Sequence, residues 1–318
     1  MTVLVNVIVT LGMLYVVPAG LRLIDPVGLR RTARLWPLPA ALGAVCLWLP
    51  RGWPATALAV LYAAACLALA ARSPGALFGR GRPPGPAGVA VATALASPSV
   101  AGSALVAERA GYRLFGFDLD ILALTVPHFH FAGFTAALVA GLVCRTAAPG
   151  PGARWAAYSV PAGTLLVLLG YFVDDWAELA GAVVLTGGMW AVALTTWREV
   201  RPAGRDRTTR ALLAASAVVL VATMLLALWW AAGEATGIPH PTLTWMAATH
   251  GLGNALGFAL CSVLAWRRLT AGHPHTAPDP PQTVPVRPHP VPDHPQLASD
   301  QPEPAPDHPQ TARQETAP

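Results

Sequence analysis

The chain has 318 residues, of which 54% are hydrophobic and only 12% are charged, and its formal net charge is +5. This composition excludes an ordinary soluble globular enzyme and is typical of a protein that crosses a membrane several times. The basic residues are all arginine and gather at the ends of apolar segments instead of forming a continuous groove, which argues against a nucleic-acid-binding protein.

A helix that crosses a bilayer needs about 20 mostly apolar residues, and nine segments of the chain approach that length. We therefore predict an all-α, polytopic helical transmembrane bundle of about nine spans. The predicted spans cover residues 3–21, 35–50, 54–71, 88–107, 121–144, 156–173, 176–197, 211–232 and 243–266. The first lacks a basic start and a small-residue cleavage site, so we expect a retained span and not a removed signal peptide.

Arginines are concentrated in alternate loops, after the first, third, fifth, seventh and ninth spans. The positive-inside rule then predicts an outer N-terminus and a cytoplasmic C-terminus. Residues 1–271 form the predicted bundle, and residues 272–318, rich in Pro and His, are expected to be a disordered cytoplasmic tail. The four cysteines (Cys46, Cys66, Cys144 and Cys261) lie in separate spans, without the spacing of a zinc site or of covalent haem attachment.

Ionisable side chains inside a bilayer are costly unless they are paired or face a cavity, so each is a candidate functional group. The fifth predicted span contains His128 and His130, and the ninth contains His250. Glu108 and Glu178 lie at the ends of the fourth and seventh spans. With the predicted orientation all of them belong to the outer half, which indicates a site open to the outer face.

Helix geometry limits how these histidines can combine. Residues two apart on a regular helix point about 200° apart, so His128 and His130 diverge unless Pro127 kinks the helix between them. In the ninth span, His250, Asn254, Gly257 and Cys261 follow one another at helical spacing and form a stripe. The likelier partner of one histidine of the fifth span is therefore His250. The alternative is a purely structural role, in which all three histidines only pack against neighbouring helices.

Two motifs carry a resemblance to a known family. The element LTVPHFHFAGF at residues 124–134 and the element MAATHGLGNALGF at residues 246–258 are similar to those of the YndJ-like family of bacterial polytopic membrane proteins. The matching positions are His128, His130, Gly133, Phe134, His250, Gly251, Asn254, Gly257 and Phe258. The resemblance implies a multi-pass protein of the bacterial plasma membrane. A looser similarity is to NnrS-type membrane proteins that bind haem and copper, and to membrane carotenoid isomerases.

Three functions remain open. The first is a histidine site for a hydrophobic small molecule that enters from the lipid bilayer, with isomerisation, cyclisation or redox chemistry. His130 and His250 could hold haem b, and His128, His130 and His250 could hold zinc, copper or iron. Without a metal, a histidine and Glu108 or Glu178 could form an acid–base pair near Asn254. The second is a proton-coupled carrier, and the third is a non-catalytic membrane subunit.

Overall fold

The computed structural model describes residues 2–78, 85–204 and 206–271. Every regular element within these ranges is helical, as a chain in lipid requires, because helices satisfy their backbone hydrogen bonds internally. Seven helical segments in this part of the chain are long and apolar enough to cross a membrane. They are Val3–Ile24, Trp53–Phe78, Pro86–Arg109, Leu119–Thr146, Asp175–Val200, Arg207–Thr236 and Leu243–Ala271. The prediction of an all-α transmembrane bundle is confirmed. The predicted tail, residues 272–318, lies outside the described residues.

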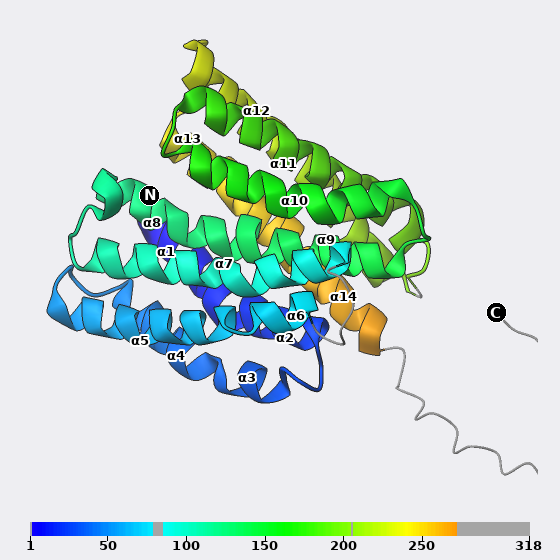
Figure 1. Ribbon diagram of the computed structural model, residues 1–318, viewed down its shortest axis with the longest axis horizontal. Coiled ribbons are helices and arrows are strands. Elements are labelled where there is room, and N and C mark those ends of the chain that lie inside the picture. The colour runs from blue at the N-terminus through cyan, green and yellow to red at the C-terminus, as the bar shows by residue number, and fades with distance from the viewer. Residues whose placement is uncertain (1, 79–84, 205, 272–318) are drawn as a thin grey trace, which may run out of the picture. The chain divides into compact units, whose positions relative to one another are not determined.

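The helices follow one another along the chain with short connections. The α-helices are α1 (Thr2–Leu11), α2 (Val17–Ile24), α3 (Arg30–Leu35), α4 (Pro37–Cys46), α5 (Trp53–Ala70), α6 (Ser73–Phe78), α7 (Pro86–Arg109), α8 (Leu119–His128), α9 (Ala136–Thr146), α10 (Pro151–Gly170), α11 (Asp175–Thr195), α12 (Arg207–Thr236), α13 (Leu243–Met246) and α14 (Cys261–Ala271). A short 3₁₀ turn, η3 (Leu114–Gly116), precedes α8. Figure 1 shows α10, α11 and α12 side by side, with α4 and α5 on the other side of α7.

Two of the nine predicted spans are not both long enough and apolar enough to cross a membrane. The second, predicted at residues 35–50, is the short helix α4 of 10 residues, about half the length that a bilayer needs. The sixth is α10, which has the necessary 20 residues but carries Arg154 and Pro161 and is not among the seven. The count of nine is thus not confirmed. The orientation of the termini stays a prediction.

Glycines let α10 and α11 pack closely. A Cβ atom added to Gly163 of α10 would lie 2.5 Å from the backbone nitrogen of Leu185 in α11, and one added to Gly181 would lie 2.5 Å from that of Val167. Such close backbone approach is typical of helix pairs in membranes. This rigid hairpin supplies one wall of the site described below.

Five segments of the described residues are π-helical, a rare geometry that is frequent at functional sites. They are η1 (Gly12–Val16), η4 (Phe129–Thr135), η5 (Thr196–Val200), η6 (Ala247–Gly251) and η7 (Gly253–Leu260). The segments η1, η4 and η7 belong to three different spans and contact one another. The span that contains η4 is also the most buried of the seven. Both histidine motifs of the sequence therefore lie where the winding of the helices changes.

Candidate histidine site

The fifth predicted span consists of α8, η4 and α9, and it carries two histidines with separate surroundings. His128 is the last residue of α8, directly after Pro127, and His130 is the second residue of η4. His130 is fully buried, whereas His128 is half-buried. Despite the proline and the π-helical winding, the two rings have different partners. The divergence expected from helix geometry is therefore present.

The His130 ring has a partner at each nitrogen. Its Nδ1 lies 2.7 Å from the carbonyl oxygen of Val126, and its Nε2 lies 2.5 Å from the hydroxyl oxygen of Tyr62 in α5. Since a carbonyl can only accept, Nδ1 carries the proton and donates, and Nε2 of the neutral ring accepts from the tyrosine hydroxyl. The rings of Tyr62 and His130 are nearly parallel, with centroids 6.0 Å apart.

Tyr62 is itself enclosed by the first third of the chain. Trp36 meets its ring edge-on, with centroids 6.0 Å apart, and donates from its indole nitrogen to the carbonyl of Met13 in η1 over 3.0 Å. Cys66 lies one helical turn beyond Tyr62 and interacts with its hydroxyl group. These contacts tie α5, the segment around α4, η1 and η4 together. His130 is thus part of the buried framework of the bundle.

In the last span, His250 is held by a closed hydrogen-bond network. Its Nδ1 donates to the carbonyl oxygen of Thr223 in α12 over 2.8 Å, and its Nε2 accepts from the amide nitrogen of Asn254 over 3.0 Å. The Asn254 oxygen accepts from the Thr223 hydroxyl over 2.7 Å. The stripe predicted for His250 and Asn254 is therefore a hydrogen-bonded unit, and it is anchored on α12.

His128 differs from the other two histidines. Within the ranges that the structure describes, its ring makes no hydrogen bond; it touches the Phe129 ring edge-on, with centroids 5.7 Å apart. It also interacts electrostatically with His250. Of the two histidines in the fifth predicted span, His128 is thus the one whose charge interacts with His250, and the predicted partnership of the two spans stays a prediction.

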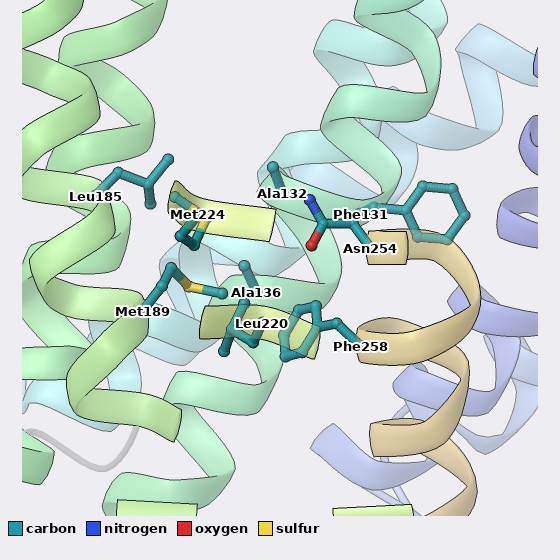
Figure 2. Close-up of a pocket in the computed structure, with 9 residues that line it drawn as sticks. All are labelled: Phe131, Ala132, Ala136, Leu185, Met189, Leu220, Met224, Asn254 and Phe258. Carbon is teal, nitrogen blue, oxygen red and sulfur yellow. The ribbon is translucent and has the colours of Figure 1, made fainter. Parts of the chain in front are cut away.

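A small apolar pocket lies beside Asn254. It is lined by Phe131, Ala132, Ala136, Leu185, Met189, Leu220, Met224, Asn254 and Phe258. These residues come from η4, α9, α11, α12 and η7, and Figure 2 shows the Asn254 amide extending from its helix toward Ala132. Ala132 follows His128 by four residues and Asn254 follows His250 by four, so the histidine pair lies about one helical turn from the cavity wall.

The geometry does not support the predicted metal or haem ligands. Among the described residues no group of three or more His, Cys, Asp or Glu side chains could hold a metal ion. The rings of His128 and His130 have different neighbours, and both ring nitrogens of His130 and of His250 already have hydrogen-bond partners. A haem between His130 and His250 would require both networks to open. These ligand sets stay predictions without structural support.

Glu108 belongs to an ion cluster at the end of α7. Its Oε1 accepts from Arg51 over 2.8 Å and from Nη2 of Arg109 over 2.6 Å, and its Oε2 accepts from Nε of Arg109. Arg109 also donates to the carbonyls of Cys46 and Leu49, at 3.3 and 3.2 Å. The cluster fastens the link between α4 and α5 to the end of α7. Its predicted acid–base role stays a prediction that these contacts do not support.

Glu178 is buried at the start of α11, and its partners are also local. It interacts with the Tyr171 hydroxyl and, through its charge, with Asp175 and Glu234. Glu234 in turn pairs with His240 over 3.1 Å. Over the described part of the chain, no hydrogen bond or ion pair joins Glu108 or Glu178 to the three histidines.

Sequence reasoning missed Tyr62 and Thr223, which hold His130 and His250 in place. Both carry a hydroxyl group within an apolar span, and a buried hydroxyl needs a partner. The sequence therefore indicates that each of these hydroxyl groups needs a hydrogen-bond partner, but it does not identify that partner.

A sequence model of the YndJ-like protein family matches residues 7–258, a range that includes both histidine motifs. Comparisons with curated proteins and with solved structures found no match.

Proposed function

The chain belongs to the YndJ-like family, and from this premise we propose that it is a protein of the bacterial plasma membrane with an acid–base site for a lipid-soluble small molecule. His128 is the proton-transferring group of that site, and His250 with Asn254 forms its fixed polar wall. The seven apolar helices support residence in a lipid bilayer. An apolar substrate would then reach the site from the membrane.

The observation that carries the proposal is the unbonded ring of His128 beside His250. The described residues provide their own comparison, because both ring nitrogens of His130 and of His250 have hydrogen-bond partners among them and neither ring nitrogen of His128 has one. A histidine with a purely structural role is expected to have partners when it lies inside a membrane. A half-buried imidazole without partners keeps both a proton donor and an acceptor available.

The other residues of the site have distinct roles. Thr223 accepts from Nδ1 of His250 through its carbonyl and donates to Asn254 through its hydroxyl, which fixes both side chains. A neutral imidazole carries one acceptor and one donor nitrogen, so the His128 ring accepts a proton at one nitrogen and then returns it. Proton transfer of this kind supports isomerisation or cyclisation without a redox cofactor.

The test compares lipid extracts from the native host deleted for this gene and complemented with variants. Wild-type protein is expected to convert at least one apolar species, detected by untargeted mass spectrometry, and His128→Gln is expected to abolish the conversion. His240→Gln is the matched control, because His240 lies in the loop after α12 and pairs with Glu234. Identical lipid profiles with wild type and His128→Gln would contradict the acid–base role.

One observation favours a carrier as the second candidate. The winding of two spans changes at the histidine pair, and interrupted helices often line transport sites. A carrier predicts that proteoliposomes accumulate the species identified above under a proton gradient without changing it. Chemical conversion by purified protein without a gradient would instead favour the enzyme.

A further inference from the structure

The chain forms a basic segment, residues 22–38, where the first membrane-spanning helix ends and α3 and α4 begin. Four arginines of this segment are exposed: Arg22, Arg30, Arg31 and Arg34. In the part of the chain that the structure describes, none of their side chains makes a hydrogen bond or an ion pair. By contrast, Arg268 in the last span pairs with Asp206 over 3.2 Å. The positive charge of the basic segment is therefore uncompensated among the described residues.

Acidic side chains nearby in the sequence are already engaged. Asp25 is the only acidic residue before Glu108. Its Oδ1 accepts from the backbone nitrogens of Val27 and Gly28, at 3.0 and 2.8 Å, and so holds the turn between α2 and α3. Glu108 belongs to the ion cluster at the end of α7. An anion that neutralises the arginines thus has to come from outside these residues.

One face of α3 is anchored to the bundle, which fixes the direction of the other. The anchoring residues are buried at helical spacing and are Leu29, Ala33 and Trp36. The Trp36 indole donates to the carbonyl of Met13 over 3.0 Å, and α3 packs against α2 (Figure 1). Arg30 and Arg34 lie four residues apart on the exposed side, where two like charges repel each other. A bound anion would relieve that repulsion.

Apolar side chains are exposed beside these arginines. Val27 is 80% exposed in the turn, Leu35 is 50% exposed at the end of α3, and Leu38 is 68% exposed in α4. The positive-inside rule explains the charge of such a segment but not the exposure of three apolar side chains within it. Basic and apolar groups side by side at the end of a span are typical of a surface that lies at a membrane interface.

We propose that the basic segment binds the headgroups of anionic phospholipids where the first span leaves the bilayer. Arginine suits this ligand because its planar guanidinium donates two parallel hydrogen bonds to a phosphate group. Val27, Leu35 and Leu38 then contact the apolar region directly below the headgroups. Nucleic acid would match the charge and leave these apolar side chains in water. The inference does not depend on His128 or on the proposed function.

The test is native mass spectrometry of the full chain in detergent micelles, titrated with phosphatidylglycerol or with phosphatidylcholine of the same acyl chains. One arginine near an anionic lipid contributes about fivefold in affinity, so two arginines should let phosphatidylglycerol bind at about 25-fold lower concentration than phosphatidylcholine. Binding of the two lipids at equal concentrations would overturn the proposal. Glycerol phosphate lacks acyl chains and is not expected to displace the lipid. Its displacement of phosphatidylglycerol would assign a soluble phosphate ester and overturn the lipid.

Three double variants locate the binding. Arg30→Gln with Arg34→Gln is expected to bring phosphatidylglycerol to the level of phosphatidylcholine, whereas the two lysine substitutions at these positions, which keep the charge, should retain most of the preference. Arg207→Gln with Arg210→Gln is the matched control, because it removes the same charge from exposed positions next to Asp206. The control is expected to bind like wild type. An equal loss of preference in the control would assign the effect to net charge and overturn the basic segment as the site.

Discussion

Replacement of Tyr62 by phenylalanine tests how the buried histidine is held. The substitution removes the hydroxyl group that donates to His130 over 2.5 Å and also interacts with Cys66, and it keeps the aromatic ring of a fully buried side chain. Hydrogen bonds between membrane helices contribute about 0.6 kcal/mol on average and up to about 1.7 kcal/mol. A buried acceptor left without its partner costs about 1–3 kcal/mol. Because Nε2 of His130 has no other partner, the expected loss lies where these ranges overlap, at about 1.5 kcal/mol.

The assay is reversible unfolding of the purified protein by sodium dodecyl sulfate in mixed micelles, followed by circular dichroism. Tyr15→Phe is the control, because the Tyr15 hydroxyl accepts from an exposed guanidinium at 2.9 Å and its loss should cost less than about 0.5 kcal/mol. In a His130→Phe background, Tyr62→Phe should also cost less than about 0.5 kcal/mol, since no acceptor remains. Equal losses in both backgrounds would refute the proposed hydrogen bond.

Three further substitutions probe the framework by the same assay. Gly163→Ala places a Cβ 2.5 Å from the backbone of α11 and should destabilise the protein by about 1–3 kcal/mol, whereas Gly187→Ala meets nothing within 4 Å and should be neutral or stabilise by about 0.5 kcal/mol. Glu108→Gln leaves a buried arginine without its carboxylate and should cost about 3 kcal/mol, against less than about 1 kcal/mol for the exposed Asp118→Asn. Hydrogen bonds from the residues that begin α12 lower the pKa of Asp206 to about 2. The stabilising effect of the Asp206 carboxylate is therefore present above about pH 4 and is lost as the pH falls toward 2. The difference in unfolding midpoint between wild type and Asp206→Asn should therefore disappear over that range.

The class of the fold could be predicted from composition, because lipid leaves a chain few alternatives to the helix. The fourth span was predicted at residues 88–107 and is the helix Pro86–Arg109. The second span could not be predicted in the same way. An apolar run that contains Pro37 and Pro39 has the hydropathy of a span, but its regular helix ends at Cys46 after 10 residues. Hydropathy measures transfer into lipid and does not measure the length of unbroken helix.

The sequence predicts that the histidine side chains of the candidate site point in different directions, but it does not predict which residues they contact. The angle between residues two apart predicts that His128 and His130 face different neighbours, and they do. Which of them meets His250 depends on how the fifth and ninth spans are rotated about their axes. That rotation follows from contacts such as the one between Tyr62 and His130, 68 residues apart, which no local pattern contains.

The first and second histidines of the HFHFAGF element have complementary positions in this structure. Irregular winding exposes backbone groups that lipid cannot satisfy, so side chains must do so. His130 donates to the Val126 carbonyl, and Thr135 donates to the His130 carbonyl over 2.9 Å. The second histidine thereby satisfies a backbone carbonyl directly before the change of winding. In our proposal the two histidines of this element therefore have different roles. His130 holds the distorted span in place, and His128, whose ring has no hydrogen bond to the described residues, exchanges the proton.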